Sequence, residues 1–287
     1  MGRALDRVDW AARVGPYRGL GFKVAIRVTD LVLGDYLDRI LASLSADGLE
    51  AAHVYSVVGW EPPGGARRSR LYLDDRRLVT TPSPAEALAT LLWHLNRSAV
   101  GSAPGHLIVH AAALEHGGGA ILLPAASGSG KTTLAAGLVK AGMGYLSDEV
   151  AAIHPTTLAV TPYPKPLTVK VGSWDVLAGL APLAADVPGP YREQQWHVDP
   201  RAIRPGSIAA PCRPRLLVFP CYRPGAVTRL VPLGRAEAVV RLATHTFSRP
   251  EPAQRGLDVL AEVVRACDAF TLVVGDLDEA CAAVRSL

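Results

Sequence analysis

A loop of small residues, set between an apolar segment and a helical pattern, constrains the fold of this 287-residue chain more than any other feature. The loop reads Ala125-Ala-Ser-Gly-Ser-Gly-Lys-Thr132, and it follows the apolar run Ala120-Ile-Leu-Leu-Pro124. Glycines let backbone N–H groups turn towards phosphate oxygens, a lysine at this position reaches the outer phosphates of a nucleotide, and the next hydroxyl can bind Mg²⁺. The positive end of the helix expected at 133–140 adds to the attraction. Strand, loop and helix therefore come in the order that nucleotide binding requires.

The predicted nucleotide-binding residues lie in this loop and at the start of the helix. Lys131 is predicted to bind the β- and γ-phosphates of ATP, and Thr132 is a predicted ligand of Mg²⁺. The usual pattern begins with glycine where this chain has Ala125, so we expect Ala125 to adopt backbone angles that a residue with a Cβ atom tolerates. A structural turn with an exposed lysine is the alternative interpretation. The predicted set is Ala126, Ser127, Gly128, Ser129, Gly130, Lys131, Thr132 and Thr133.

An acidic pair, Asp148-Glu149, follows the next predicted strand, and its first residue lies 17 positions after Lys131. Near a phosphate-binding loop, one carboxylate can bind Mg²⁺ and the other can accept the proton of an attacking hydroxyl. Asp148 is the predicted metal ligand beside Thr132, and the base is Glu149 or Asp148. Neighbouring strand residues point to opposite faces, so both carboxylates reach one site only if the chain turns there. An ordinary solvated turn is the alternative.

Histidines and additional cations complete the candidate site. His110 lies in the strand predicted before the loop and is a candidate catalytic residue, although a histidine on an apolar strand more often belongs to the core. His116, in a glycine-rich turn, is expected to be exposed. Phosphoryl transfer favours further cations near the γ-phosphate. The candidates, each more often a solvated surface residue, are Lys165, Lys170, Arg201, Arg204, Arg213 and Arg215.

The predicted elements divide the chain into a smaller α+β accessory domain, residues 1–100, and an α/β domain, residues 101–287. In the first, strands are expected at 22–28, 52–58 and 69–73, with a loop at 61–65. Its clearest helix begins at Pro84, with Ser83 as its cap and Glu86 reaching back. A small-residue connector at 98–105 marks the boundary. Beyond it, strands are expected at 107–114, 120–123, 145–147, 150–153, 167–171, 216–219 and 270–274, helices at 133–140, 236–244, 251–267 and 277–284, and loops at 186–190 and 199–205.

Composition argues against several kinds of partner. The 30 basic and 26 acidic residues give a net charge of only +4, and the one tight basic cluster, Arg67-Arg68-Ser-Arg70, is interpreted as the end of a hairpin. The four cysteines lack the spacing of a zinc or redox site. No stretch reaches the roughly 18 apolar residues of a membrane helix, and the N-terminus lacks the apolar core of a signal peptide. We therefore expect no nucleic acid, no membrane and a cytoplasmic location.

The pattern His110-(x)14-Ala-Ala-Ser-Gly-Ser-Gly-Lys-Thr-Thr-(x)14-Asp-Glu resembles the catalytic core of HPr serine kinases and their relatives. The resemblance covers about residues 105–155 and extends more weakly through Pro164-Lys-Pro166 and residues 213–225. It implies a P-loop kinase core in which His110, Ser127 to Thr133, Asp148 and Glu149 occupy matched positions. The later Gly/Asn-rich signature of the bifunctional HPr enzymes is missing, which argues against HPr as substrate and leaves the reverse phosphorylase reaction open. The chain is similar to the branch that modifies ribosomally made peptides.

Together these features predict a Mg²⁺- and ATP-dependent kinase that phosphorylates a hydroxyl, foremost a serine in a peptide or protein. The predicted catalytic residues are Asp148, Glu149, Lys131 and His110, and the predicted metal ligands are Thr132 and Asp148. Residues 1–100 are the natural place for peptide recognition or assembly, and the resemblance makes a homo-oligomer plausible. A small-molecule kinase is one alternative, and a nucleotide-dependent switch or ATPase without a phosphoryl acceptor is the other.

Overall fold

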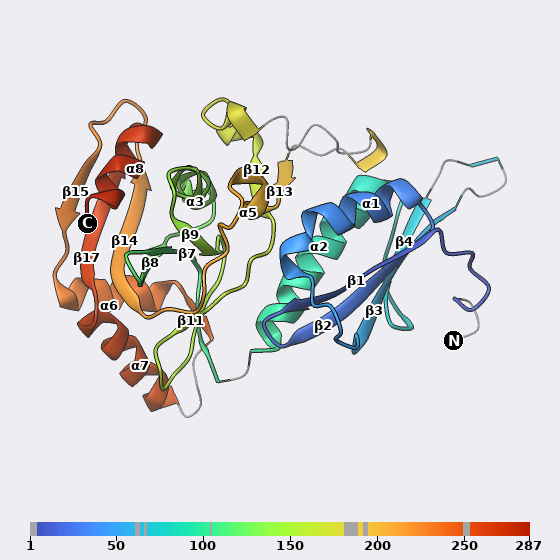
Figure 1. Ribbon diagram of the computed structural model, residues 1–287, viewed down its shortest axis with the longest axis horizontal. Helices are drawn as coiled ribbons and strands as arrows, with labels where there is room; N and C mark the ends of the chain where they lie inside the picture. The colour runs from blue at the N-terminus through green and yellow to red at the C-terminus, as the bar shows by residue number, and fades with distance from the viewer. Residues whose placement is uncertain are drawn as a thin grey trace.

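The computed structural model describes residues 5–60, 64–65, 68–103, 105–180, 189–191, 195–248 and 253–287. These residues form two units of mixed α/β structure, which follow one another along the longest axis of the molecule (Figure 1). The loops predicted at 61–65 and 186–190 lie largely outside the described residues.

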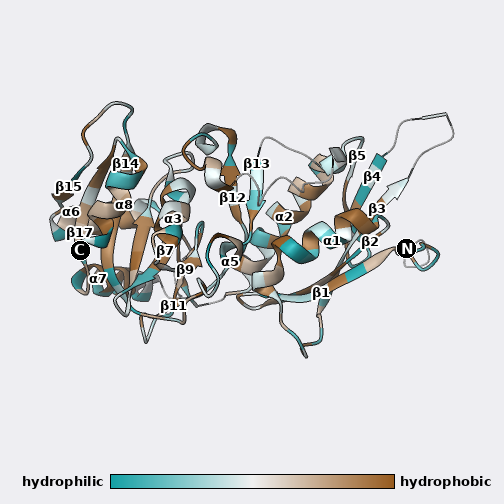
Figure 2. Ribbon diagram, turned by 45° about the horizontal axis from the view of Figure 1, so that its top comes forward, coloured by the Kyte–Doolittle hydropathy of each residue, from teal (hydrophilic) through white to brown (hydrophobic). Residues whose placement is uncertain are grey.

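The N-terminal unit is a five-stranded sheet with two helices packed on it. The strand order is β1-β2-β3-β4-β5, and β2 and β3 are its parallel pair. Apolar and polar stretches alternate along both helices (Figure 2), and their buried leucines join one core cluster with the strands. The strands expected at 22–28, 52–58 and 69–73 are confirmed as β2, β3 and β4. The bounds are β1 (Ala12–Gly19), β2 (Phe22–Val28), α1 (Leu31–Ile40), the 3₁₀ turn η2 (Ala42–Leu44), β3 (His53–Trp60), β4 (Arg68–Leu73), β5 (Arg76–Thr81) and α2 (Pro84–Gly101).

Helix α2 begins where the sequence predicts and ends later. The Ser83 hydroxyl accepts the Glu86 backbone N–H at 3.2 Å, as an N-cap does. The Glu86 carboxylate, expected to reach back to the start of the helix, accepts instead the hydroxyl of Thr81. The helix continues to Gly101 because Ala99 extends its buried face by a further turn. The connector predicted at 98–105 is therefore wrong over residues 98–101.

The C-terminal unit is built around a six-stranded sheet in the order β15-β17-β14-β8-β7-β9, in which β8, β14 and β17 run parallel. Helices α3 and α8 pack on one face and α6 and α7 on the other, each pair with its own apolar core. The predicted helices are confirmed, that at 251–267 over residues 253–265. The bounds are β7 (Ala111–His116), β8 (Gly119–Pro124), α3 (Lys131–Lys140), β9 (Gly144–Ser147), β14 (Pro214–Tyr222), β15 (Arg229–Pro232), α6 (Arg235–Thr244), α7 (Ala253–Arg265), β17 (Asp268–Val274) and α8 (Leu277–Arg285).

Two smaller sheets, β11-β10-β6-β16 and β12-β13, lie beside the large one. The strand predicted at 107–114 is broken at His110, because β6 pairs in the four-stranded sheet and β7 in the six-stranded one. The His110 backbone N–H donates to the carbonyl of His245 at 2.7 Å and fixes the break. The remaining bounds are β6 (Leu107–Val109), β10 (Ala151–Ile153), β11 (Val160–Thr161), β12 (Leu167–Lys170), η3 (Val171–Ser173), η4 (Ala178–Leu180), η5 (Gly189–Tyr191), β13 (Gln195–Val198), α5 (Pro200–Ile203) and β16 (Thr246–Ser248).

Side chains of the C-terminal unit complete the core of the N-terminal unit. Tyr163 is fully buried in that core, and a Cβ atom at Gly19 would lie 2.7 Å from its ring. The backbone N–H and hydroxyl of Ser43 donate to the Asp199 carboxylate at 2.9 and 2.7 Å. Asp199 also caps α5, which lies in the middle of the molecule (Figure 2). The surface loop predicted at 199–205 is therefore wrong, since its first residues form a short helix at the contact between the units.

Among the described residues, no helix combines the length and the apolar character needed to cross a membrane.

Candidate active site

The predicted phosphate-binding loop lies at the carboxyl end of the parallel strands. β8 ends at Pro124 and α3 begins at Lys131, so residues 125–130 join a central strand to a packed helix. Gly128 and Gly130 have φ values of +82° and +87°, which glycine adopts without strain. Ala125 has a negative φ, as expected for a residue with a Cβ atom. Open sheets with parallel strands bind ligands at this edge, so the loop stands where a nucleotide phosphate could be held.

Lys131 is buried, with 6% of its surface exposed, and its ammonium group turns back over the loop. Its Nζ donates to the carbonyls of Ala125 at 2.6 Å and Ala126 at 2.8 Å. Burial lowers the pKa of Lys131 to about 8, while Asp148 and Glu149 act in the opposite direction. A poorly hydrated cation at the N-terminus of a helix attracts an anion strongly.

The hydroxyl groups around the loop differ in what they contact. Thr132 Oγ1 donates to Asp148 Oδ2 at 3.3 Å and so connects the loop with the acidic pair. Thr133 Oγ1 lies 2.6 Å from Ser173 Oγ, and both residues line the same cavity as the loop. The Ser129 hydroxyl oxygen is buried and has no hydrogen-bond partner among the described residues.

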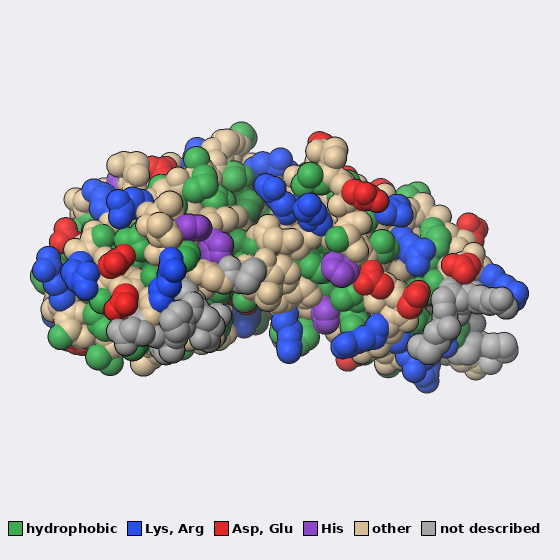
Figure 3. Space-filling model, turned by 90° about the horizontal axis from the view of Figure 1, so that it is seen from below, with side chains coloured by type: hydrophobic (Ala, Val, Ile, Leu, Met, Phe, Trp, Pro, Cys, Tyr) green, Lys and Arg blue, Asp and Glu red, His purple; other side chains and the backbone are tan. Residues whose placement is uncertain are grey.

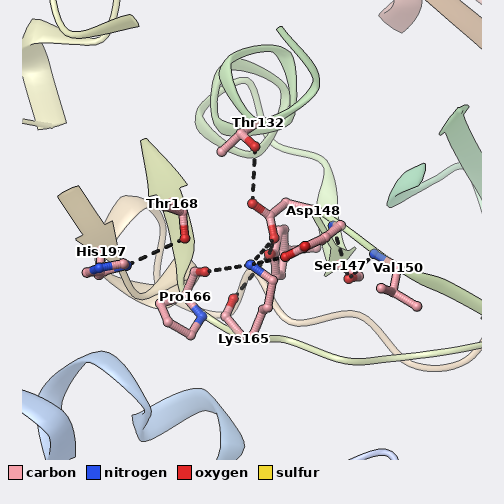
Figure 4. Close-up of polar contacts among 10 residues, drawn as sticks. Thr132, Ser147, Asp148, Val150, Lys165, Pro166, Thr168 and His197 are labelled. Carbon is pink, nitrogen blue, oxygen red and sulfur yellow. Dashed lines mark hydrogen bonds and ion pairs between the residues drawn. The ribbon is translucent and has the colours of Figure 1, made fainter. Parts of the chain in front are cut away.

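The chain turns at residues 148–149, so both carboxylates contact one lysine. Figure 4 shows the contact between Lys165 and Asp148. Lys165 Nζ lies 2.9 Å from Asp148 Oδ1 and 3.2 Å from Glu149 Oε2, and it also donates to the Pro166 carbonyl at 3.2 Å. The Tyr145 hydroxyl donates to Asp148 Oδ1 at 3.1 Å. The Asp148 side chain is 2% exposed, whereas that of Glu149 is 42% exposed. The turn that the sequence required for both carboxylates to meet is therefore present.

Charge attraction dominates this cluster. Lys165 lowers the pKa of Glu149 against the effect of burial, which favours the ionised carboxylate. Burial disfavours the charge of Lys165, but Asp148 and Glu149 hold its pKa above the ordinary value. Burial, together with Asp148, raises the pKa of Tyr145, so its hydroxyl remains a donor. Asp148 is thereby held on the side of Thr132, and Glu149 keeps an accessible carboxylate.

His110 lies at the break between β6 and β7, beside the loop. Its ring packs edge-on against Phe247, with the ring centroids 5.1 Å apart. Burial and the charge of Lys131 lower the pKa of His110, and Glu149 opposes them, so the imidazole is neutral at pH 7. His110 lines the same cavity as the loop and the acidic pair. The structure thus brings together the four residues that the sequence singled out as catalytic.

A cavity of about 840 Å³ extends from the loop to the N-terminal unit. Residues 127–133, Asp148 and Glu149 form the wall on the C-terminal side, and α2 contributes the wall on the N-terminal side. Tyr163, Lys165 and His197 line the region where the two units meet. The cavity therefore has one wall from each unit.

The four arginines considered as phosphate-binding cations have other positions. Arg201 is exposed and contacts Asp199. Arg204 donates at 3.2 and 2.9 Å to two carbonyls at the C-terminal end of α3. Arg213 and Arg215 lie beside the first residues of β8, at the end of that strand opposite to the loop. Since β8 reaches the loop only at its other end, these two arginines are not part of the site.

The expectation that each candidate cation is solvated is wrong for Lys165, because its ammonium group is buried against the acidic pair. Lys170 is exposed at the end of β12 and lines the cavity. Sequence reasoning missed Tyr145 and His197, whose polar atoms face the site only after β9 and β13 have packed. It also missed the contribution of α2. Two prolines around Lys165, inside an apolar segment, are the one local signal that could have marked this lysine.

The residues present fit a nucleotide phosphate and Mg²⁺. The unsatisfied Ser129 hydroxyl and the left-handed glycines suit an anion, and the oxygens of Thr132 and Asp148 are of the hard type that Mg²⁺ prefers. No group of three or more His, Cys, Asp or Glu side chains suited to a metal ion occurs in the part of the chain that the structure describes. Mg²⁺ would therefore take further ligands from the nucleotide and water, as is usual for this ion.

On the surface seen in Figure 3, Lys and Arg side chains are spread over both units among acidic ones and form no continuous basic stripe. Comparison of the chain with models of known protein families finds no match, and comparison with curated protein sequences finds none either. What the protein does is therefore inferred from the geometry of the site and from the residues that carry the resemblance.

Proposed function

We propose that this protein is a Mg²⁺- and ATP-dependent kinase that transfers the γ-phosphoryl group to a hydroxyl, foremost a serine of a peptide or protein. One observation carries the proposal: the loop lysine and threonine, an acidic pair and a buried lysine converge on one cavity. The resemblance of residues 110–149 to HPr-type serine kinases supports the same reaction. A nucleotide-binding loop alone would be compatible with many functions, whereas an accessible carboxylate beside it provides a base.

Separate residues bind the phosphates, hold the metal ion and accept the proton. Lys131 and the N–H groups of the loop bind the phosphates, and Thr132 with Asp148 would hold Mg²⁺, which neutralises phosphate charge when bound. Glu149 is assigned as the base because the Asp148 carboxylate is buried and accepts from Thr132, whereas the Glu149 side chain is 42% exposed. Glu149 accepts the proton of the acceptor hydroxyl while the oxygen of that hydroxyl bonds to the γ-phosphorus. The bond between that phosphorus and the β–γ bridging oxygen breaks, and ADP leaves.

The test is transfer of labelled phosphate. The purified protein is incubated with Mg²⁺, γ-labelled ATP and a panel of synthetic serine peptides, and label is expected on serine. Lys131→Ala should lower transfer by about 1,000-fold or more, because it removes the cation that positions the phosphates. Lys140→Ala, at the exposed end of α3, is the control and should retain activity.

Other outcomes would redirect the proposal. Label released only as free phosphate in every mixture would favour an ATPase or a nucleotide-dependent switch. Transfer to small hydroxyl compounds but to no peptide would favour a small-molecule kinase. Absence of any thermal stabilisation by Mg-ATP would contradict nucleotide binding itself.

A further inference from the structure

Helix α2 presents two faces to two different surroundings. One face, which includes Leu88 and Leu91, is buried against the sheet of the N-terminal unit. A second stripe with the spacing i, i+3, i+4 and i+7 lines the cavity opposite the phosphate-binding loop. The stripe consists of Ala89, Leu92, Trp93 and Asn96.

The middle of this stripe is apolar and open. Trp93 is 57% exposed, and the Arg97 guanidinium lies 5.5 Å from its ring centroid. Leu92 is half-buried beside it, and Val176 of the C-terminal unit, 59% exposed, lines the same cavity. An aromatic residue left open in a cavity wall gains free energy when an apolar group covers it. This part of the wall suits an apolar side chain of a ligand.

Two buried polar atoms in the same cavity lack partners. Asn96 Oδ1 and Tyr163 Oη have no hydrogen-bond partner among the described residues, and both residues line the cavity. Burial raises the pKa of Tyr163, so its hydroxyl is a donor, whereas Asn96 Oδ1 is an acceptor. Leaving such groups unpaired costs stability, so they are expected to be satisfied by a ligand. One acceptor and one donor match the N–H and C=O groups of a peptide backbone.

We propose that the α2 wall is the acceptor-binding site and that it takes a peptide segment with an aliphatic or aromatic side chain next to the phosphorylated hydroxyl. That side chain packs on Leu92 and Trp93, and the peptide backbone bonds to Asn96 and Tyr163. The site rests on the proposed kinase function, since the opposite wall is the one that binds the phosphates. It gives that function a substrate class: a peptide recognised by an apolar neighbour of its hydroxyl-bearing residue.

The experiment uses synthetic peptides with one central serine flanked by alanine, leucine, phenylalanine, lysine or aspartate. The kcat/KM of the leucine and phenylalanine peptides should exceed that of the lysine and aspartate peptides about tenfold, the factor expected for burying one apolar side chain. Trp93→Ala should lower kcat/KM for the leucine peptide about tenfold, through the peptide KM, and leave the KM for ATP unchanged. Asn96→Ala should lower kcat/KM for all five peptides to a similar extent. Leu31→Ala, which truncates a 56% exposed residue of α1 outside the cavity lining, should change neither constant.

The experiments distinguish an error in the proposed peptide-binding site from an error in the proposed kinase function. Phosphorylation of all peptides with equal kcat/KM, or an unchanged leucine-peptide KM in Trp93→Ala, would overturn the site and leave the kinase function standing. If no peptide is phosphorylated, the anisotropy of fluorescein-labelled leucine and lysine peptides decides. Tighter binding of the leucine peptide that is lost in Trp93→Ala supports the site, and equal binding of both peptides overturns it.

Discussion

The two walls of the cavity are built on different principles. The C-terminal wall consists of a loop and a turn whose charged groups contact one another, with Lys165 between Asp148 and Glu149. The N-terminal wall is one stripe of a regular helix, apolar in its middle and with an unpaired oxygen at Asn96. Each wall has a buried polar atom without a partner among the described residues, Ser129 Oγ in the first and Asn96 Oδ1 in the second, but only the first contains a charged cluster. The difference suggests that reaction chemistry is concentrated in one unit and selection of the acceptor in the other.

Removing Lys165 breaks the charge balance of the C-terminal wall. Lys165→Met leaves the two neighbouring carboxylates without their shared cation, so we expect kcat to fall about 100-fold. The pKa of Glu149 is lowered chiefly by Lys165, and its base form is the ionised one. Loss of the lysine therefore raises that pKa and moves the acid limb of the kcat–pH profile to higher pH. Steady-state transfer assays between pH 5 and 9 measure both effects.

Two further variants keep this prediction specific. Lys165→Arg restores a cation and should recover part of kcat together with the original acid limb. Lys140→Met, at the exposed end of α3, should behave like the parent protein. A folded Lys165→Met protein with an unchanged pH profile would show that the acidic pair does not depend on this cation.

The C-terminal wall could be predicted in large part because its signals are local in the sequence. Glycine spacing determines the conformation of residues 125–130, and adjacent acidic residues after a short strand mark the turn at 148–149. Lys165 was one of six candidate cations, and nothing local sets it apart in charge. Its burial depends on β12 and the turn meeting in space, which a sequence pattern does not encode.

The N-terminal wall escaped prediction for a different reason. The pairs Ala87-Leu88 and Leu91-Leu92, followed by Leu95, predict a helix with one apolar face. The helix is confirmed and most of this face is buried, but Leu92 is only half-buried and lines the cavity. The stripe at Leu92 and Trp93 indicates a binding site only because the phosphate-binding loop lines the same cavity. The packing of the two units brings them together, and a sequence pattern does not show that packing. The break at His110 is likewise a tertiary effect, since apolar residues on both sides of it favour one continuous strand.

His197 lies where the two walls meet, and its burial makes the stability of the protein depend on pH. Burial and then Lys165 lower its pKa to about 4, so the folded protein keeps it neutral where the unfolded chain, with a pKa near 6.5, binds a proton. The free energy of unfolding therefore falls as pH drops from 6.5 towards 4. Between pH 6.5 and 5, the free energy of unfolding of His197→Gln should therefore fall by about 2 kcal/mol less than that of the parent protein. Urea unfolding at both pH values measures this difference.

His116→Gln, at the end of β7, removes an imidazole far from this contact and serves as the control. Parallel pH dependence in the parent and His197→Gln proteins would contradict a neutral, buried His197. It would also mean that water reaches the His197 imidazole in the folded protein.

The smallest predicted effect concerns a hydrogen bond between the two units. Ser43→Ala removes the hydroxyl that donates to Asp199 at 2.7 Å, at the contact between the units, and should cost about 1 kcal/mol of unfolding free energy. Because Asp199 stays bound to the Ser43 backbone N–H and to α5, the units should loosen without separating. We expect the acceptor-peptide KM to rise about threefold and the ATP KM to stay constant.

Ser45→Ala is the matched control, since the Ser45 hydroxyl contacts only Asp47 at the exposed surface among the described residues. Equal changes in both KM values for Ser43→Ala would mean that the phosphate-binding loop also responds to the distance between the units. In that case the two walls would form one coupled site. A change confined to the acceptor would instead mean that nucleotide binding is complete within the C-terminal unit and that packing of the N-terminal unit tunes the acceptor alone.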